Sequence, residues 1–160
     1  MTRYLFFFLN YYYFLFNDFY SFGGQDKHLR LIDYLRNPEF MGEFKRFCMR
    51  AFCAETVTFF VDMQQRDQIA RMDTEARTVE CKRIYETYIR EGSLLELNLT
   101  DPVRSAIQAA HKKCPDDIGV FDQALKDMYW LMKTNLFPAW KQDAGFLKLR
   151  LKVTRNVLAL

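Results

Sequence analysis

The sequence contains none of the short motifs that bind nucleotides or form common hydrolytic sites. It has no G-x-x-x-x-G-K-[ST] loop, no G-x-G-x-x-G fingerprint, no G-x-S-x-G turn and no H-E-x-x-H zinc motif. Its two histidines lie far apart and its four cysteines form no C-x-x-C pair, so the usual zinc-ligand spacings are missing. These absences favour an interaction module without metal or cofactor over an enzyme.

The size and charge of the chain exclude further classes. A formal net charge of +3 is too small for a typical nucleic-acid partner. The 160 residues suffice for one domain with a substantial core, and a composition of 50% apolar and 27% charged residues is typical of a folded domain. The scattered cysteines are typical of reduced, mostly buried thiols. We therefore expect one cytoplasmic domain that is monomeric.

The first residues differ in composition from the rest. Residues 4–22 are nearly all Phe, Tyr and Leu, and Gly23-Gly24 then marks a break. Three interpretations of this run stay open: aromatic packing on the domain, a mistaken start translated from AT-rich non-coding sequence, or contact with a membrane. The predicted organisation is an extension over residues 1–24, a domain over 25–152 and a helical tail over 153–160.

From residue 27 onward the sequence has helical periodicity almost throughout. The clearest stripe follows the i, i+3, i+4, i+7, i+8 pattern of one buried helix face and consists of Cys81, Ile84, Tyr85, Tyr88 and Ile89. The last segment, 146–160, has apolar residues at helical spacing, although 148–153 also alternates as a strand would. With no partner strand elsewhere, the sequence predicts an all-α domain of eight or nine helices.

A connector over residues 91–102 separates two of the predicted helices. Gly92 and Ser93 favour the end of the first helix, because glycine costs backbone entropy in a helix and serine competes for backbone hydrogen bonds. Asp101 is expected to cap the next helix, and Pro102 suits its first position.

Inside this connector, leucines alternate with polar residues. An extended segment places alternate side chains on opposite sides, so one side would be buried and the other would face solvent. The expected buried residues are Leu95, Leu97 and Leu99, and the connector would then expose Asn98.

Six segments together resemble the regulator of G-protein signalling (RGS) domain, in its order and with its gaps. FCAETVTFF at 52–60 is similar to the family's E-(F/Y)-S-x-E-N-(I/L)-x-F-W, and ELNL at 96–99 is similar to its x-(V/I)-N-(I/L). The other matching segments are 31–47, 82–89, 121–132 and 137–140, and the resemblance covers about residues 28 to 150.

This resemblance implies a nine-helix fold with an antiparallel four-helix bundle and a second lobe formed by both chain ends. It also implies binding to the GTP-bound α subunit of a heterotrimeric G protein, at the inner face of the plasma membrane, and faster GTP hydrolysis. Because the α subunit carries its own catalytic arginine and glutamine, such a domain supplies positioning rather than a catalytic group.

The resemblance also assigns residues to the contact with the G protein. Asn98 matches the loop asparagine beside the switch glutamine, where an amide can donate and accept at once; the alternative is an Asx turn with nearby backbone. Glu55 matches a glutamate on the first contact loop, and the alternative is a carboxylate stabilised by the helix dipole. The full expected set is Cys53, Glu55, Thr56, Glu96, Asn98, Leu131, Asn135, Leu136 and Ala139.

Several of these positions depart from the family pattern. Thr56 replaces an asparagine, Asn135-Leu136 replaces an Asp-Ser pair, and Ala139 replaces an arginine that would donate to that aspartate. These changes favour an alternative function, an RGS-homology scaffold or sequestering module that binds an α subunit or a peptide without accelerating hydrolysis.

A third class is a protein of the membrane surface. It rests on the aromatic run at 4–22 and on basic residues of the last helix, which are Lys148, Arg150, Lys152 and Arg155. The basic residues are equally typical of a solvated helix face, which the sequence favours.

Overall fold

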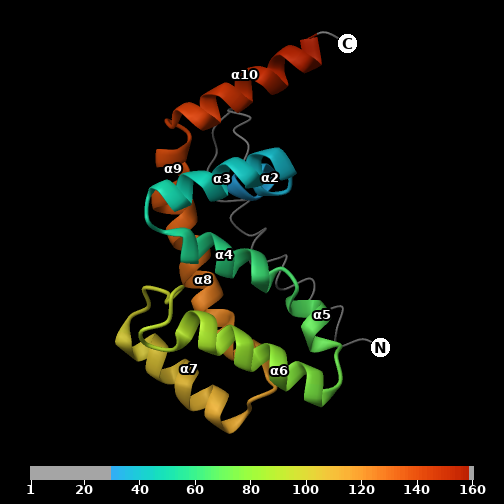
Figure 1. Cartoon of the computed structure of the whole chain (residues 1–160), viewed down its shortest axis with the longest axis vertical. Helices are drawn as coiled ribbons and strands as arrows, with labels where there is room; N and C mark the ends of the chain where they lie inside the picture. Colours follow the sequence, from blue (N-terminus) through green and yellow to red (C-terminus); the bar gives the residue numbers. More distant parts are fainter. Residues whose placement is uncertain (1–29, 159–160) are drawn as a thin grey trace, which may run out of the picture.

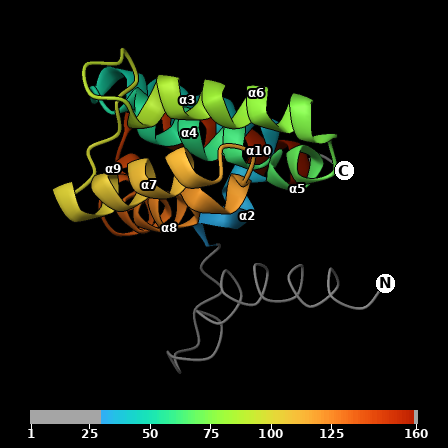
Figure 2. The same cartoon turned by 90° about the horizontal axis from the view of Figure 1, so that it is seen from below.

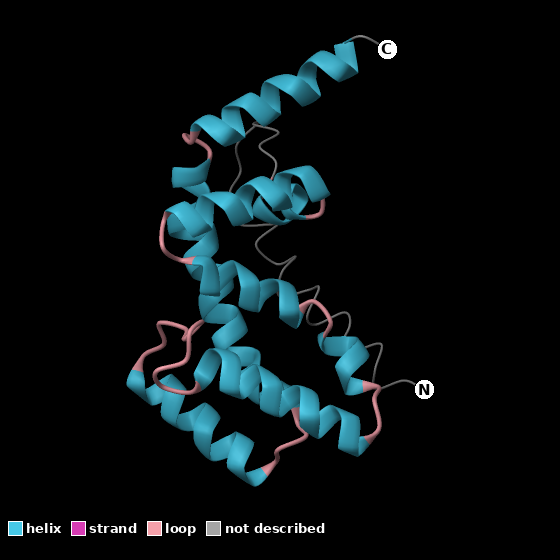
Figure 3. Cartoon of the chain, in the orientation of Figure 1, coloured by secondary structure: helices cyan, strands magenta, loops and turns pink. Residues whose placement is uncertain are grey.

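The computed structural model describes residues 30–158, and those residues form helices and loops without a strand. Figure 3 shows this all-helical architecture, which confirms the predicted fold class. The α-helices are α2 (Leu31–Leu35), α3 (Pro38–Arg50), α4 (Ala54–Met63), α5 (Arg66–Ala70), α6 (Thr74–Ile84), α7 (Asp101–Lys113), α8 (Asp122–Leu131), α9 (Phe137–Trp140) and α10 (Ala144–Leu158).

Short helical turns of other types extend some of these helices. A π-helical turn, η2 (Tyr85–Ile89), continues α6, and a second one, η4 (Met132–Leu136), joins α8 to α9. A 3-10 turn, η3 (Ile118–Phe121), leads into α8. Since π-helical turns are rare and occur frequently at functional sites, the ends of η2 and η4 are the first places to look for one.

The helices form two lobes, as Figure 1 shows. Helices α4, α6, α7 and α8 make a bundle in the lower part of the view, while α2, α3, α9 and α10 from both ends of the chain make a second lobe above it. Helix α10 packs on α3, and the pair α4 and α8 connects the two parts.

The terminal lobe is built around the buried Trp140. Its ring centroid lies 4.8 Å from that of Phe146 on α10, 5.0 Å from that of Phe44 on α3 and 6.0 Å from that of Tyr34 on α2. Edge-to-face pairs of this kind contribute about 0.5–1.5 kcal/mol each beyond the burial of their area. One tryptophan therefore holds four helices from opposite ends of the chain together.

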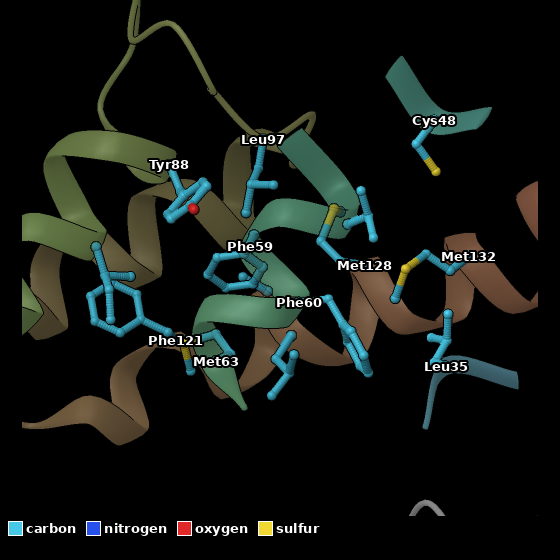
Figure 4. Close-up of a cluster of buried hydrophobic side chains, with 14 of the residues drawn as sticks. Leu35, Cys48, Phe59, Phe60, Met63, Tyr88, Leu97, Phe121, Met128 and Met132 are labelled. Atoms are coloured by element: carbon cyan, nitrogen blue, oxygen red, sulfur yellow. The ribbon is translucent and has the colours of Figure 1, made fainter. Parts of the chain in front are cut away.

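The bundle has its own buried cluster, drawn in Figure 4. Phe59 of α4 packs edge to face with Tyr88 of η2, with ring centroids 5.2 Å apart. Met132 lies between Cys48 and Leu35 in the same view, so the core continues from the bundle into the terminal lobe. The molecule has one continuous core.

The predicted helical stripe before the connector is confirmed, because Cys81, Ile84, Tyr88 and Ile89 are buried and Tyr85 packs against them. The last segment forms the helix α10, as predicted. The predicted cap at Asp101 is wrong. Helix α7 begins at Asp101 with Thr100 as its N-cap, whose side chain makes no capping hydrogen bond, so Pro102 lies one residue deeper than expected.

The aromatic run at 4–22 lies outside the described residues, and so does the start of the predicted domain at residue 25. Within residues 30–158, no helix combines the length and the apolar character needed to cross a membrane.

Candidate functional site

The connector begins with a tight turn after η2. Gly92 has a φ of +75°, and the N–H of Ser93 donates to the carbonyl of Arg90 at 3.2 Å, which is the geometry of a type II turn. The hydroxyl of Ser93 then donates to the carbonyl of Thr87 at 2.9 Å. Gly92 supplies the left-handed backbone that the turn requires, and Ser93 fastens the turn to the preceding helix.

Beyond the turn, the alternation of leucines places the polar side chains outside. Leu97 and Leu99 are buried, Leu95 is half-buried and packs against the core, and Asn98 is exposed. Within residues 30–158, the side-chain amide of Asn98 makes no hydrogen bond with the protein, so the Asx turn considered above is not formed. The predicted exposure of Asn98 is confirmed, and its amide stays available to a partner.

A buried arginine fixes the shape of the connector. Arg104, in the first turns of α7, is 8% exposed and donates to the carbonyls of Ile89 and Leu97, the latter at 2.7 Å. It also pairs with the Glu96 carboxylate at 2.9 Å. The guanidinium therefore joins the end of η2 to the segment that carries Asn98. Its planar group has several N–H donors that point in different directions, so it can reach both carbonyls at once.

Glu96 belongs to the same network. One carboxylate oxygen accepts from Arg104, and the other accepts from the N–H of Gly92 at 2.7 Å. This half-buried carboxylate thus closes the connector on itself. These two bonds show that Glu96 stabilises the connector. Its expected contact with a partner stays a prediction.

The connector is also fastened to the bundle through Leu97. Its N–H donates to the carbonyl of Tyr88 at 2.9 Å, and its side chain points toward Phe59 and Tyr88 (Figure 4). The hydroxyl of Tyr88 donates to Asp62 at 2.9 Å, and burial together with that carboxylate raises the pKa of the phenol well above its usual value. Tyr88 therefore stays a protonated donor at any physiological pH.

A second exposed turn connects α3 to α4. Helix α3 ends in a Schellman motif, in which the N–H of Cys53 donates to the carbonyl of Cys48 at 3.0 Å and that of Phe52 to Met49 at 3.3 Å. Phe52 occupies the left-handed position of this motif with a φ of 53°, where glycine is the usual residue, and its side chain is 95% exposed. An aromatic ring held in solvent on strained backbone is typical of a binding surface.

The expected contact residues that follow Phe52 differ in exposure. Glu55 is half-buried in the first turn of α4, and its carboxylate accepts from the hydroxyl of Thr56 at 3.3 Å. Thr56 is only 1% exposed, so its side chain lies beneath the surface. Cys53 is half-buried, its thiol donates to the carbonyl of Cys48 at 3.5 Å, and burial raises its pKa.

The remaining expected residues lie along the helix that runs from α8 into α9. Asn135 and Ala139 are exposed, while Leu131 and Leu136 are half-buried. The π-helical turn η4 carries Asn135 and Leu136, the pair that departs from the family pattern. These four side chains carry no charge, and Asn135 places an amide where the pattern has a carboxylate.

These elements lie on one side of the molecule. In Figure 1 the connector, the α3–α4 turn and α9 all face the left edge, and Figure 2, turned by 90°, shows them again at the same end. The two turns thus lie on one side of the molecule, beside a shared core that includes Leu97 and Phe59.

The family follows from one further comparison. Residues 30–149 match the model of the regulator of G protein signaling domain. The chain belongs to this family. The search of curated proteins found no match. RGS domains are in general regulators that bind the α subunits of heterotrimeric G proteins, and they are generally not catalysts themselves. The bounds expected for the extension and the tail stay predictions.

The parts that two residues play at the exposed turns are hard to infer from the sequence. Arg104 looks like any charged residue near the start of a helix, and only its burial against two carbonyls reveals its part. Phe52 stands at a helix end where glycine is common, and that mismatch is the one signal the sequence offers.

We predict that Arg104→Met destabilises the RGS domain by about 2–4 kcal/mol, because two carbonyls and a carboxylate lose a buried donor. The matched control is Arg90→Met, which removes an exposed arginine paired with Glu86 at 3.0 Å and should cost less than about 1 kcal/mol. Urea unfolding measures both, and equal losses would show that Arg104 does not hold the connector.

Proposed function

We propose that this RGS domain activates the GTPase of a heterotrimeric G-protein α subunit by binding its switch regions in their transition-state arrangement. The observation that carries the proposal is the exposed, unbonded amide of Asn98, held between the buried Leu97 and Leu99. An asparagine presented in this way can orient a polar side chain of the partner without titrating.

The physical basis is the rigidity of the frame around Asn98. Arg104 and Glu96 fix the connector before any partner arrives. Binding energy spent on mobile switch segments then lowers the barrier to hydrolysis rather than ordering the RGS domain itself. The α subunit retains the chemistry, since its own arginine stabilises the transferring phosphoryl group and its glutamine orients the attacking water.

Phe52 and Glu55 would add a second contact from the α3–α4 turn. The ring of Phe52 projects into solvent from a backbone already fixed by the Schellman bonds. An exposed aromatic side chain on a fixed backbone has only two side-chain torsions to order on binding, which makes it a favourable anchor for an interface.

An alternative function is a scaffold or sequestering module that binds an α subunit or a peptide without accelerating hydrolysis. It is supported by the burial of Thr56, whose hydroxyl is directed to Glu55. It is also supported by the neutral surface of Asn135, Leu136 and Ala139, which lacks the acid–arginine pair of the family pattern. This alternative predicts binding of the α subunit with an unchanged rate of hydrolysis.

We predict that the protein accelerates single-turnover GTP hydrolysis by a cognate α subunit and that Asn98→Ala reduces this acceleration about tenfold or more. The free energy of unfolding should change by less than about 0.5 kcal/mol, because the amide has no partner in the described domain. Gln64→Ala, which shortens another exposed amide at the end of α4, should leave the rate unchanged. Absence of acceleration across several α-subunit classes would reject the activating function.

For Phe52→Gly we predict opposite effects on stability and binding. Glycine should stabilise the domain by about 1 kcal/mol because it relieves the left-handed strain, and should weaken α-subunit binding about fivefold or more. Phe52→Ala is the control, since it removes the ring but keeps a Cβ at the same φ. Binding that is unaffected in both variants, measured by calorimetry, would remove Phe52 from the interface.

A further inference from the structure

The outer face of α10 exposes leucines. Leu147 is 45% exposed and Leu151 is 59% exposed, and their spacing of four residues places them next to each other on one face of the helix. The opposite face packs on the domain through Phe146, Leu149 and Val153. Helix α10 therefore has an apolar face for its own core and a second apolar strip that faces solvent.

Basic residues surround this strip. At 100° per residue, Lys148 and Arg155 lie beside the leucines on the outward face, and Arg150 and Lys152 lie on its two flanks. All four are exposed, and the sequence of α10 contains no acidic residue. The outward face thus combines leucines with positive charge alone.

The acidic residues around α10 are already engaged. Glu39 pairs with Lys152 at 2.9 Å, and Asp143 pairs with Arg50 at 2.9 Å. Within residues 30–158, no acidic side chain pairs with Lys148, Arg150 or Arg155. Two positive charges of the outward face and one on its flank therefore remain available to an external anionic surface.

The position of α10 suits a flat partner. In Figure 1 the helix is the outermost element at the top of the molecule, away from the connector that carries Asn98. A planar surface could follow its length without touching the face proposed to bind the α subunit. The two surfaces could thus be occupied at the same time.

We propose that the outward face of α10, formed by Leu147, Lys148, Leu151 and Arg155, binds the surface of a membrane that contains anionic lipids. Leucines flanked by lysine and arginine on one face of a helix are the composition of an interfacial amphipathic helix, whose apolar side chains enter the boundary between headgroups and acyl chains. Each basic residue near an anionic leaflet adds attraction that salt weakens. This proposal is independent of GTPase activation.

The test measures binding of the full chain to vesicles by sedimentation. The expected result is stronger binding to phosphatidylcholine mixed with phosphatidylserine than to phosphatidylcholine alone, and weaker binding as salt rises. The double variant Lys148→Glu/Arg155→Glu should bind the mixed vesicles at least about tenfold more weakly. The double variant Leu147→Asn/Leu151→Asn should also bind the mixed vesicles about tenfold more weakly, because it loses apolar burial while its charge is unchanged.

Matched controls lie far from α10 and use exposed positions. Lys112→Glu/Lys113→Glu makes the same change of charge at the end of α7, and Val79→Asn removes an apolar residue that is 61% exposed on α6. Both controls should bind vesicles like the unchanged chain, and thermal unfolding should show all variants folded. Since every variant keeps residues 1–24, any contribution of the aromatic run is equal in all of them.

Two results would overturn the proposal. One is vesicle binding that both α10 variants retain within about twofold of the unchanged chain. The other is a chain that binds no vesicles but binds poly-glutamate, with the double variant Lys148→Glu/Arg155→Glu losing that binding. This result would assign the face to an acidic protein.

Discussion

The geometry of the connector depends on one buried guanidinium. Arg104 donates to the carbonyls of Ile89 and Leu97 and pairs with Glu96, so it joins the last turn of one helix to the strand-like segment that follows. A buried charge is costly unless such partners surround it, and here two carbonyls and a carboxylate surround the guanidinium. Together with the backbone hydrogen bond from Leu97 to Tyr88, this arginine holds the segment that carries Asn98 in place.

The two exposed turns share the core beneath them. Leu97 reaches from the connector toward Phe59 of α4, the helix that also carries Glu55 and follows Phe52 (Figure 4). A close-packed core has few voids that could absorb a displacement. A shift of one turn is therefore opposed by the packing beneath the other. The face that we propose for the α subunit is therefore preorganised, which would reduce the entropy lost on binding.

Much of this architecture was predictable from periodicity, because burial of alternate or helical positions is a direct consequence of backbone geometry. The exposure of Asn98 between leucines is the clearest example. The rest depended on tertiary contacts. Composition and periodicity do not indicate that Arg104 enters the core or that Thr56 turns inward. The one hint of the left-handed backbone at Phe52 is its place at a helix end where glycine is common. Asp101 was misplaced as a cap because helix ends depend on backbone angles that composition indicates only weakly.

In the function that we propose, the exposed face recognises the transition state of GTP hydrolysis rather than the α subunit in general. The most direct measurement is the affinity of the unchanged protein for a GDP-bound α subunit with and without aluminium fluoride, which mimics the transferring phosphoryl group. We predict much tighter binding with aluminium fluoride, as complementarity to the transition state requires. Equal affinity in both states would contradict it and would support the scaffold function.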